Sequence, residues 1–359
     1  MKKKLYGDLE FELKSSKRNF CRPLGGIFEL TYACDFNCVH CYCKGSERLE
    51  EELTLAQIKG ILLELKSSGC LRVAFSGGDP LRRKDFVDIY LFAKRKGFLV
   101  DIFTSGFNLT DKIISVLKKF PPHCLEITLN GISKNIYEAV TRKPGSFEPA
   151  LENINKLKQN GLPLVIKSNC LSLNKNEIVE IKSFSKELFG ADSRRFRLDP
   201  IILPRLNGDK APCAYRLSGQ EIKNIFEADK EIMAEYTDSL ACNSGVCRDK
   251  KFIYQCSAWR SGFFINPFGK IKFCQFSDEF SVDLKKDSLE GYLSQISEKI
   301  LTEEFKTDSN CKDCRLRVFC YYCPARAKLE TGSKEEPVHY FCELARFREQ
   351  DFQRAYKSQ

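Results

Sequence analysis

The chain has 359 residues, of which 43% are hydrophobic and 30% charged, so it can bury a core and is longer than one ordinary domain needs. No stretch approaches the roughly eighteen apolar residues of a membrane span. Asp8 and Glu10 lie where a signal peptide would have its apolar run. The sequence therefore argues against membrane and secreted classes and predicts a soluble, cytoplasmic protein.

The net charge of +10 comes from 58 Lys and Arg against 48 Asp and Glu. These basic residues are spread along the chain, and none of their runs is interleaved with aromatic residues in the pattern of a nucleic-acid-binding motif. We interpret the excess as a solvated basic surface and expect no nucleic-acid partner.

Cysteine is the residue type that most constrains the function, with 18 Cys against 3 His. In a reducing compartment, thiols in such numbers hold metals or redox centres more often than structural disulfides. The spacing of the cysteines is therefore the main guide to function.

Strand and helix patterns alternate through the first 205 residues. The predicted strands are 27–32, 71–75, 98–103, 124–129, 163–167 and 195–202, and the predicted helices are 53–67, 84–96, 110–119, 147–160 and 175–189. Such an alternation predicts a parallel α/β domain, because parallel strands need helical crossovers. The units are too few for a closed eight-unit barrel, which leaves an incomplete barrel or an open sheet.

The alternation ends after about residue 205 in a segment rich in Pro, Gly and Asn, which indicates a domain boundary. The second module opens with an amphipathic stretch near 218–236 and contains a predicted hairpin at 261–274 that turns between Pro267 and Gly269. We expect an N-terminal arm at 1–24, a core domain at 25–205, a bridging region at 206–250 and a cysteine-rich domain at 251–359.

The first cysteine group is Cys34-x3-Cys38-x2-Cys41, in the loop after the first predicted strand. Three thiolates this close together can hold three corners of a 4Fe-4S cube and leave the fourth iron without a protein ligand. An open metal position admits a substrate, whereas closed coordination holds a fold together. We expect these three cysteines to be both cluster ligands and the catalytic centre.

The segment CDFNCVHC has the CxxxCxxC form and resembles the radical S-adenosylmethionine (SAM) enzymes. Gly77-Gly78-Asp79-Pro80, just after the second predicted strand, is similar to the GGEP motif of that family, which receives the amino group of SAM. The resemblance implies a partial (β/α)6 barrel that carries a 4Fe-4S cluster and SAM. It also implies reductive cleavage of SAM to a 5'-deoxyadenosyl radical, which abstracts a hydrogen atom from the substrate.

The same resemblance implies which residues contact SAM. The two glycines would let the backbone approach the ligand, and Asp79, where the family more often has Glu, would accept a hydrogen bond from its ammonium group. His40 would pack near the cluster or the adenine without being a ligand. The implied cofactor-binding residues are Gly77, Gly78, Asp79, Ser105, Thr128, Asn130 and Arg142.

The cysteines of the C-terminal part closely resemble those of the SPASM domain, which adds one or two auxiliary iron-sulfur clusters to radical SAM enzymes. The resemblance implies one cluster held by Cys311, Cys314, Cys320 and Cys342. A second cluster would take Cys256, Cys274 and Cys323, with its fourth corner open or filled from upstream. Cys242 and Cys247 are the upstream candidates, and Cys247 is preferred because it is nearer in sequence. CxxC pairs also form zinc ribbons, so zinc is the alternative metal. We interpret remaining thiols such as Cys43 as buried small hydrophobes.

The segments CRLRVFCYYCPAR and FRLDPIILPR look most like the group that contains the pyrroloquinoline quinone peptide maturase. We therefore expect a thioether or carbon-carbon crosslink on a peptide or protein side chain, with a reducing partner such as flavodoxin or ferredoxin. Arg197 and Asp199 would face the substrate or form a structural salt bridge. Only about 25 residues precede the first strand, so a separate binding protein would present any leader peptide.

Two alternatives stay open. A radical SAM enzyme acting on a small molecule or a tetrapyrrole cofactor precursor would carry the same motifs. A non-catalytic zinc-binding interaction protein would need the CxxC pairs to hold zinc and the first three cysteines to be idle. Iron and sulfide analysis after anaerobic purification separates the zinc protein from both enzymes.

Overall fold

The computed structural model describes residues 23–45, 51–190, 192, 195–234, 236, 251–254 and 261–357. Cys247 and Cys256, two of the expected cluster ligands, lie outside the described residues. No helix within these ranges combines the length and the apolar character that crossing a membrane requires.

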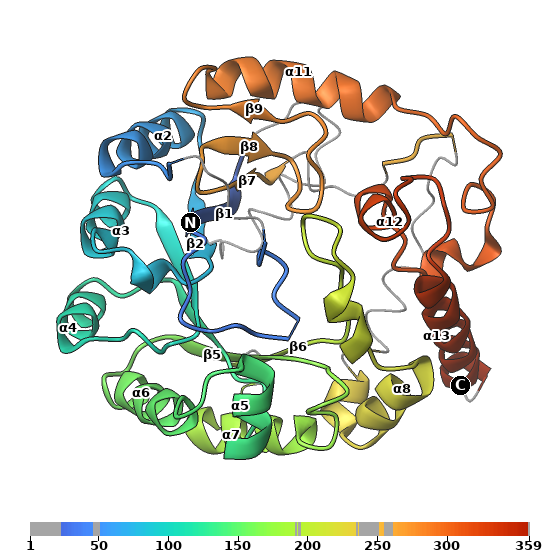
Figure 1. Cartoon of the computed structure of the whole chain (residues 1–359), viewed down its shortest axis with the longest axis horizontal. Coiled ribbons are helices and arrows are strands. Elements are labelled where there is room, and N and C mark those ends of the chain that lie inside the picture. The colour runs from blue at the N-terminus through green and yellow to red at the C-terminus, as the bar shows by residue number, and fades with distance from the viewer. Residues whose placement is uncertain are drawn as a thin grey trace, which may run out of the picture.

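Six parallel strands form the barrel part of the molecule (Figure 1). They are β1 (Gly25–Thr31), β2 (Arg72–Gly77), β3 (Leu99–Thr104), β4 (Cys124–Thr128), β5 (Leu164–Asn169) and β6 (Phe196–Asp199). Each strand pairs in parallel with the next one along the chain. The α/β fold and the partial (β/α)6 barrel expected from the sequence are confirmed.

Helices cover the outer side of this curved sheet (Figure 1). They are α2 (Leu55–Ser67), α3 (Phe86–Arg95), α4 (Asp111–Lys119), α5 (Lys134–Thr141), α6 (Phe147–Gln159) and α7 (Ile178–Phe189). Thr54 begins α2 through a capping box with Gln57, which satisfies backbone donors at the helix start. The sequence predicted a single helix between β4 and β5, and α5 was missed because two turns are too short to show a helical period.

The strands alternate between an apolar outer face and a more polar inner face. On β1, Phe28 and Leu30 are fully buried in the core under the helices, and Glu29 between them lies on the inner face. On β3, Val100 and Ile102 repeat the outer pattern. The core therefore lies between sheet and helices, and the barrel interior is free to carry charged side chains.

Three short strands of the C-terminal module extend the same sheet past β1 (Figure 1). They are β7 (Phe264–Ile265), β8 (Lys270–Lys272) and β9 (Val282–Asp283), in the sheet order β6-β5-β4-β3-β2-β1-β7-β8-β9. The predicted hairpin is confirmed as the antiparallel pair β7 and β8. Its parallel pairing with β1 was not predicted, so the two parts of the chain share one sheet.

Glycine makes this junction possible. A Cβ atom on Gly26 would lie 2.3 Å from the carbonyl oxygen of Phe263, and Ile27 N donates a hydrogen bond to that oxygen at 3.0 Å. Only a residue without a side chain lets the module approach the edge of β1 this closely.

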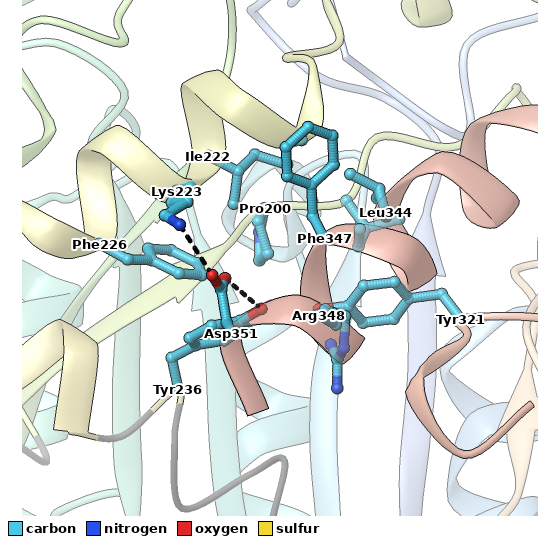
Figure 2. A pocket seen from close by; sticks show the side chains of 12 residues that line it. Pro200, Ile222, Lys223, Phe226, Tyr236, Tyr321, Leu344, Phe347, Arg348 and Asp351 are labelled. Carbon is cyan, nitrogen blue, oxygen red and sulfur yellow. Dashed lines mark hydrogen bonds and ion pairs between the residues drawn. The ribbon is translucent and has the colours of Figure 1, made fainter. Parts of the chain in front are cut away.

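Among the described residues after the barrel, the helices with assigned bounds are α8 (Gly219–Glu227), α11 (Leu289–Thr302), α12 (Pro324–Thr331) and α13 (His339–Lys357). Helix α13 packs against α8, and Figure 2 shows the seam between them with Lys223 and Tyr236 directed at Asp351. The Lys223 ammonium is 2.9 Å from the Asp351 carboxylate, beside a cavity of only about 20 Å³. The bridging region is thus tied to the C-terminal helix by charge and close packing.

Candidate functional site

The three cysteines of the first group lie in the loop that leaves the C-terminal end of β1. Backbone hydrogen bonds from Asn37 and Val39 to the last turn of α5 fix the loop, at 2.9 and 3.0 Å. Beside it lies a cavity of about 470 Å³ lined by Cys34, Cys41 and Cys43, together with aromatic rings such as that of Phe36. Three thiols on a pinned loop next to a roomy cavity fit a bulky sulfur-bound group.

Burial favours the neutral form of two of these thiols, Cys34 and Cys38. Loss of solvent raises the pKa of Cys34 to about 11 and raises that of Cys38 further. The charges of Cys41 and Cys34 add to the effect at Cys38, so the three sulfurs lie close enough to act on one another. A cationic iron centre would supply the positive charge that the thiolates lack, because metal binding replaces the thiol protons.

Cys43 adds a fourth sulfur that the sequence analysis treated as a buried hydrophobe. Its Sγ lies 3.5 Å from Cys41 Sγ, and this contact is the main cause that lowers the pKa of Cys41 to about 6. Cys43 is buried as expected, yet it also lines the cavity. The sequence signal for this contact was the position of Cys43, two residues after Cys41.

The Gly77-Gly78 turn packs against the start of the cysteine loop. Gly77 has a φ of +132°, and a Cβ there would lie 2.1 Å from the carbonyl oxygen of Thr31. A Cβ on Gly78 would lie 2.5 Å from the carbonyl oxygens of Tyr32 and Ala33. The glycines thus allow a close approach between two backbone segments of the protein itself, and their expected contact with a ligand stays a prediction.

Asp79 is committed to the same scaffold. Its carboxylate is fully buried and accepts hydrogen bonds from Thr104 Oγ1 at 2.8 Å, from Ser105 N at 3.1 Å and from Leu81 N at 3.0 Å. The Ser105 hydroxyl donates to it as well, at 2.5 Å. With these partners, Asp79 holds the turn after β3 in position, and its expected contact with an ammonium group stays a prediction.

Asn130 and His40 meet at the ends of the strands. Asn130 Oδ1 accepts a hydrogen bond from Asn169 N at 2.7 Å, and Asn130 Nδ2 lies 3.4 Å from His40 Nε2. Burial, followed by the charge of Lys167, lowers the pKa of His40 to about 4. Thr128 is half-buried at the end of β4. The structure therefore gathers these predicted residues on one side of the barrel mouth.

Arg142 stands apart from this group. It ends α5 with a left-handed backbone, at a φ of 52°, and its guanidinium donates to the Tyr215 hydroxyl at 3.2 Å. Its side chain is exposed, and it does not line the cavity next to the cysteines. The geometry thus ties Arg142 to the loop after the barrel.

Two further predicted residues lie on β6. Arg197 reaches Glu126 on the barrel interior, with 2.8 Å between guanidinium and carboxylate. The Asp199 carboxylate accepts a hydrogen bond from Ile201 N at 3.0 Å. Of the two roles that the sequence left open for Arg197, the geometry favours the structural salt bridge.

Four predicted cysteines of the C-terminal module lie within electrostatic reach of one another. Burial is the main cause that raises the pKa of Cys311 to about 11 and that of Cys320 to about 12, and both also feel Cys342 and Cys314. Cys342 lies in α13, and the other three flank the turn Arg315–Phe319. These four thiols act on one another although helix α12 separates them in sequence.

Cys274 and Cys323, expected at the other cluster, lie beside a second cavity. It measures about 260 Å³ and is lined by their chain neighbours Gln275 and Pro324. In the part of the chain that the structure describes, no group of three or more His, Cys, Asp or Glu side chains has an arrangement that could hold a metal ion.

Comparison with known proteins identifies one domain of the chain. Residues 28–184 match the model of the radical SAM superfamily. The AdoMet-dependent heme synthase of Methanosarcina barkeri is 24% identical over 332 residues, which cover 86% of this chain and 94% of that protein. The PqqA peptide cyclase of Bradyrhizobium diazoefficiens is 28% identical over 178 residues, 49% of this chain and 46% of that protein.

Solved structures agree in fold. Streptococcus suis SuiB bound to S-adenosylmethionine superimposes with a TM-score of 0.68 at 17% identity, over 94% of this chain and 81% of that chain. Native anSMEcpe with bound AdoMet superimposes with a TM-score of 0.71 at 17% identity, over 94% and 99% of the two chains. Residues 28–184 thus form a radical SAM domain, and the chain is an enzyme.

Proposed function

We propose that this radical SAM enzyme modifies a side chain of a peptide or protein. The observation that carries the proposal is the shared sheet, in which the cysteine-rich module pairs with β1, the strand that leads into the cysteine loop. A module in that place can cover the barrel mouth while holding further redox centres. PqqA peptide cyclase is a relative, and SuiB bound to its precursor peptide has the same fold with a TM-score of 0.69.

The residues around the first cavity fit the cofactors of the family. Cys34, Cys38 and Cys41 would hold the 4Fe-4S cluster, and the cavity of about 470 Å³ beside them would take SAM. When bound, the reduced cluster and SAM supply the radical that removes a hydrogen atom from the substrate. The chain itself fixes the loop through its contacts to α5 and shields the site from water with the Phe36 and Phe268 rings.

The contacts expected for SAM remain part of the proposal in revised form. Backbone groups of Gly77 and Gly78 would meet its amino group. Ser105, Thr128 and Asn130, which lie at or just after the ends of β3 and β4, would contact the adenosyl part. Asp79 would hold the turn in position, and Arg142 would contact the ligand only through a movement of its exposed side chain.

Auxiliary clusters would occupy the C-terminal module. Cys311, Cys314, Cys320 and Cys342 would surround one cluster, which their mutual electrostatic effects support. Cys274 and Cys323 would share another with Cys256 and Cys247. A bond formed from a substrate radical leaves one surplus electron, and these centres give it a path away from the active site.

Mass spectrometry of candidate peptides tests the peptide proposal. The anaerobically reconstituted enzyme is incubated with SAM, dithionite and a peptide library rich in Cys and aromatic residues. Loss of two hydrogen atoms from a peptide, with formation of 5'-deoxyadenosine, is the expected result. Release of 5'-deoxyadenosine without any change in peptide mass would contradict it.

A second candidate function is chemistry on a tetrapyrrole cofactor precursor. The similarity to AdoMet-dependent heme synthase favours it, because that match covers 94% of the relative, whereas the match to PqqA peptide cyclase covers 46%. Adding iron coproporphyrin III in the same assay separates the two candidates, since a change in its visible absorption spectrum would show tetrapyrrole chemistry.

We also propose that the enzyme works in the cytoplasm with an electron donor such as flavodoxin or ferredoxin. If the substrate carries a leader peptide, a separate small protein would bind and present it. Neither a nucleic acid nor a membrane is part of the proposal.

A further inference from the structure

The loop that follows β1 carries a cysteine that the proposed function does not use. Cys43 lies two residues after Cys41, and both side chains line the cavity of about 470 Å³. The two Sγ atoms are 3.5 Å apart, a distance at which one thiol donates a hydrogen bond to the other sulfur. Cys43 is therefore in direct contact with a proposed cluster ligand.

Tyr42, between the two cysteines, is anchored at both its backbone and its side chain. Its carbonyl oxygen accepts a hydrogen bond from Leu206 N at 2.8 Å, and its hydroxyl donates to Glu29 Oε1 at 2.6 Å. The segment is thus tied to the loop after the barrel on one side and to β1 on the other. Because the residue between them is held in this way, the contact between the sulfurs of Cys41 and Cys43 is built into the loop.

Aromatic rings separate Cys43 from solvent. This residue is only 4% exposed and packs in one apolar cluster with Tyr32 and Phe268, whose rings meet edge to face with their centroids 5.7 Å apart. Phe268 comes from the hairpin of the C-terminal module, and Leu53 N donates to the carbonyl oxygen of the preceding Pro267 at 2.8 Å. This enclosure keeps water away from the thiol, so a neighbouring sulfur is the partner within its reach.

The direction of the hydrogen bond follows from the cluster proposed at Cys34, Cys38 and Cys41. A sulfur that binds iron has lost its proton, so Cys41 Sγ can only accept a hydrogen bond. Cys43 is outside the proposed ligand set and keeps its thiol proton, so it is the donor. Hydrogen bonds to ligand sulfurs help to set the reduction potential of an iron-sulfur cluster, because they stabilise the negative charge that reduction adds.

We propose that Cys43 is a positioning residue for the reduction step: its thiol donates a hydrogen bond to the Cys41 sulfur and makes the cluster easier to reduce. The inference rests on the proposed function, since it takes Cys41 as a cluster ligand. One electron passes to the cluster from a one-electron donor such as flavodoxin or ferredoxin, no bond forms or breaks, and Cys43 keeps its proton. A less negative potential lets such a donor reduce a larger fraction of the enzyme.

A redox titration of this cluster tests the donor without any turnover. The anaerobically reconstituted enzyme is titrated with dithionite and redox mediators, and electron paramagnetic resonance follows the signal that is identified by its change when SAM is added. Cys43→Val removes the donor and fills its space with apolar atoms, so water cannot take its place. The midpoint potential should become more negative. At the midpoint of the parent, the ratio of reduced to oxidised cluster in the variant should be about two- to fivefold lower.

Two further variants separate hydrogen bonding from packing. Cys43→Ser keeps a donor beside the Cys41 sulfur and should restore most of the parent's potential. Cys43→Ala removes the donor without adding bulk and replaces Cys43→Val in the test if the larger side chain lowers the thermal unfolding midpoint. The control is Cys70→Ala, which removes a fully buried thiol that donates to the Arg72 carbonyl oxygen at 3.4 Å and should leave the potential unchanged.

The outcomes separate this inference from the proposed function. An unchanged midpoint potential in the variants that lack the donor overturns the role of Cys43, and so does a potential in Cys43→Ser as negative as that in Cys43→Val. Loss of the cluster in Cys43→Val and Cys43→Ala alike would make Cys43 an iron ligand and would also overturn the inference. If the parent shows no signal that responds to SAM, the proposed function itself fails.

Discussion

The barrel and the cysteine-rich module are stabilised in different ways. The barrel strands have four to seven residues, and their outer side chains form a continuous apolar core with the helices. The described strands of the module have two or three residues, and charged contacts such as those of Lys334 with Glu279 and Glu303 join its loops. The same apolar core continues into the module through residues such as Ile265, Ile296 and Phe341, so the module adds charged contacts and its thiol ligands to a core that it shares with the barrel.

Removing cysteines should have the largest effects. In the barrel it should affect the reaction, and in the module it should affect the fold. Cys34→Ala, Cys38→Ala and Cys41→Ala combined should abolish 5'-deoxyadenosine production under dithionite, because the cluster loses all three proposed ligands. Circular dichroism and the thermal unfolding midpoint should stay close to those of the parent, since the barrel core does not include these side chains.

The matched change in the module is Cys311→Ala, Cys314→Ala and Cys320→Ala. Limited proteolysis should then cleave within 306–345 while the barrel remains protected. Retained 5'-deoxyadenosine production by the first triple variant would contradict the cluster assignment, and unchanged proteolysis of the second would contradict the contrast between the regions.

Strand β1, which pairs with the module, carries an acid whose ionisation should lower the stability of the fold. Glu29 is fully buried, and burial raises its pKa to about 7 from 4.5, although Tyr42 donates a hydrogen bond to it at 2.6 Å. The unfolded state therefore loses its proton first, and stability falls as the pH rises from about 4.5 through 7. The shift corresponds to about 3 kcal/mol.

Glu29→Gln keeps an acceptor for Tyr42 and removes the ionisation. Urea unfolding between pH 4.5 and 8 should show the variant gaining stability over the parent as the pH rises. Glu148→Gln is the control, because Lys134 lowers the pKa of the exposed Glu148, and any effect should be small and of opposite sign. A difference between Glu29→Gln and the parent that does not change with pH would refute the assignment.

The bridging region offers a third comparison. Arg216 forms a two-pronged ion pair with Glu330 at 2.6 Å for each oxygen, donates to the Ile202 carbonyl oxygen at 2.8 Å and lies over the Tyr340 ring. Arg216→Ala should lower the free energy of unfolding by roughly 2 kcal/mol, since a largely buried acid loses its partner. Arg216→Lys should recover only part of it, because an ammonium cannot bind both oxygens in this geometry.

Two glycines of the barrel should respond in opposite directions. Gly78→Ala forces a Cβ against backbone carbonyls at 2.5 Å, so we expect a loss of about 1–2 kcal/mol and reduced iron incorporation. Gly60→Ala, in the middle of α2 with no atom within 4 Å of the added Cβ, should gain about 0.5–1 kcal/mol. Thermal unfolding measures both, and a stabilising Gly78→Ala would contradict the packing described for the Gly77-Gly78 turn.

The sequence predicted the barrel well because its signals are local. Each strand is a short apolar run, each long helix shows a 3.6-residue period, and the predicted strand 98–103 differs from the observed Leu99–Thr104 by one residue at each end. The pairing of β7 with β1 was missed because Ile27 and Phe264 are far apart in sequence and neither run reveals its partner.

The sequence indicated which residues belong to the site better than it indicated what each of them contacts. The Cys34, Cys38 and Cys41 spacing is visible in the letters, but the burial of Asp79 depends on hydrogen bonds from Thr104 and Ser105 on another strand. Long-range contacts of this kind leave no pattern in a single sequence.

The shared sheet has one more consequence, for any attempt to dissect the molecule. Cutting the chain between the barrel and the hairpin would strip β1 of its neighbour and present its bare amide and carbonyl groups to solvent, beside an apolar Phe28 layer. An exposed strand edge of this kind pairs with other chains. A barrel produced by itself should therefore aggregate, and it would need an added peptide strand on that edge to remain monomeric.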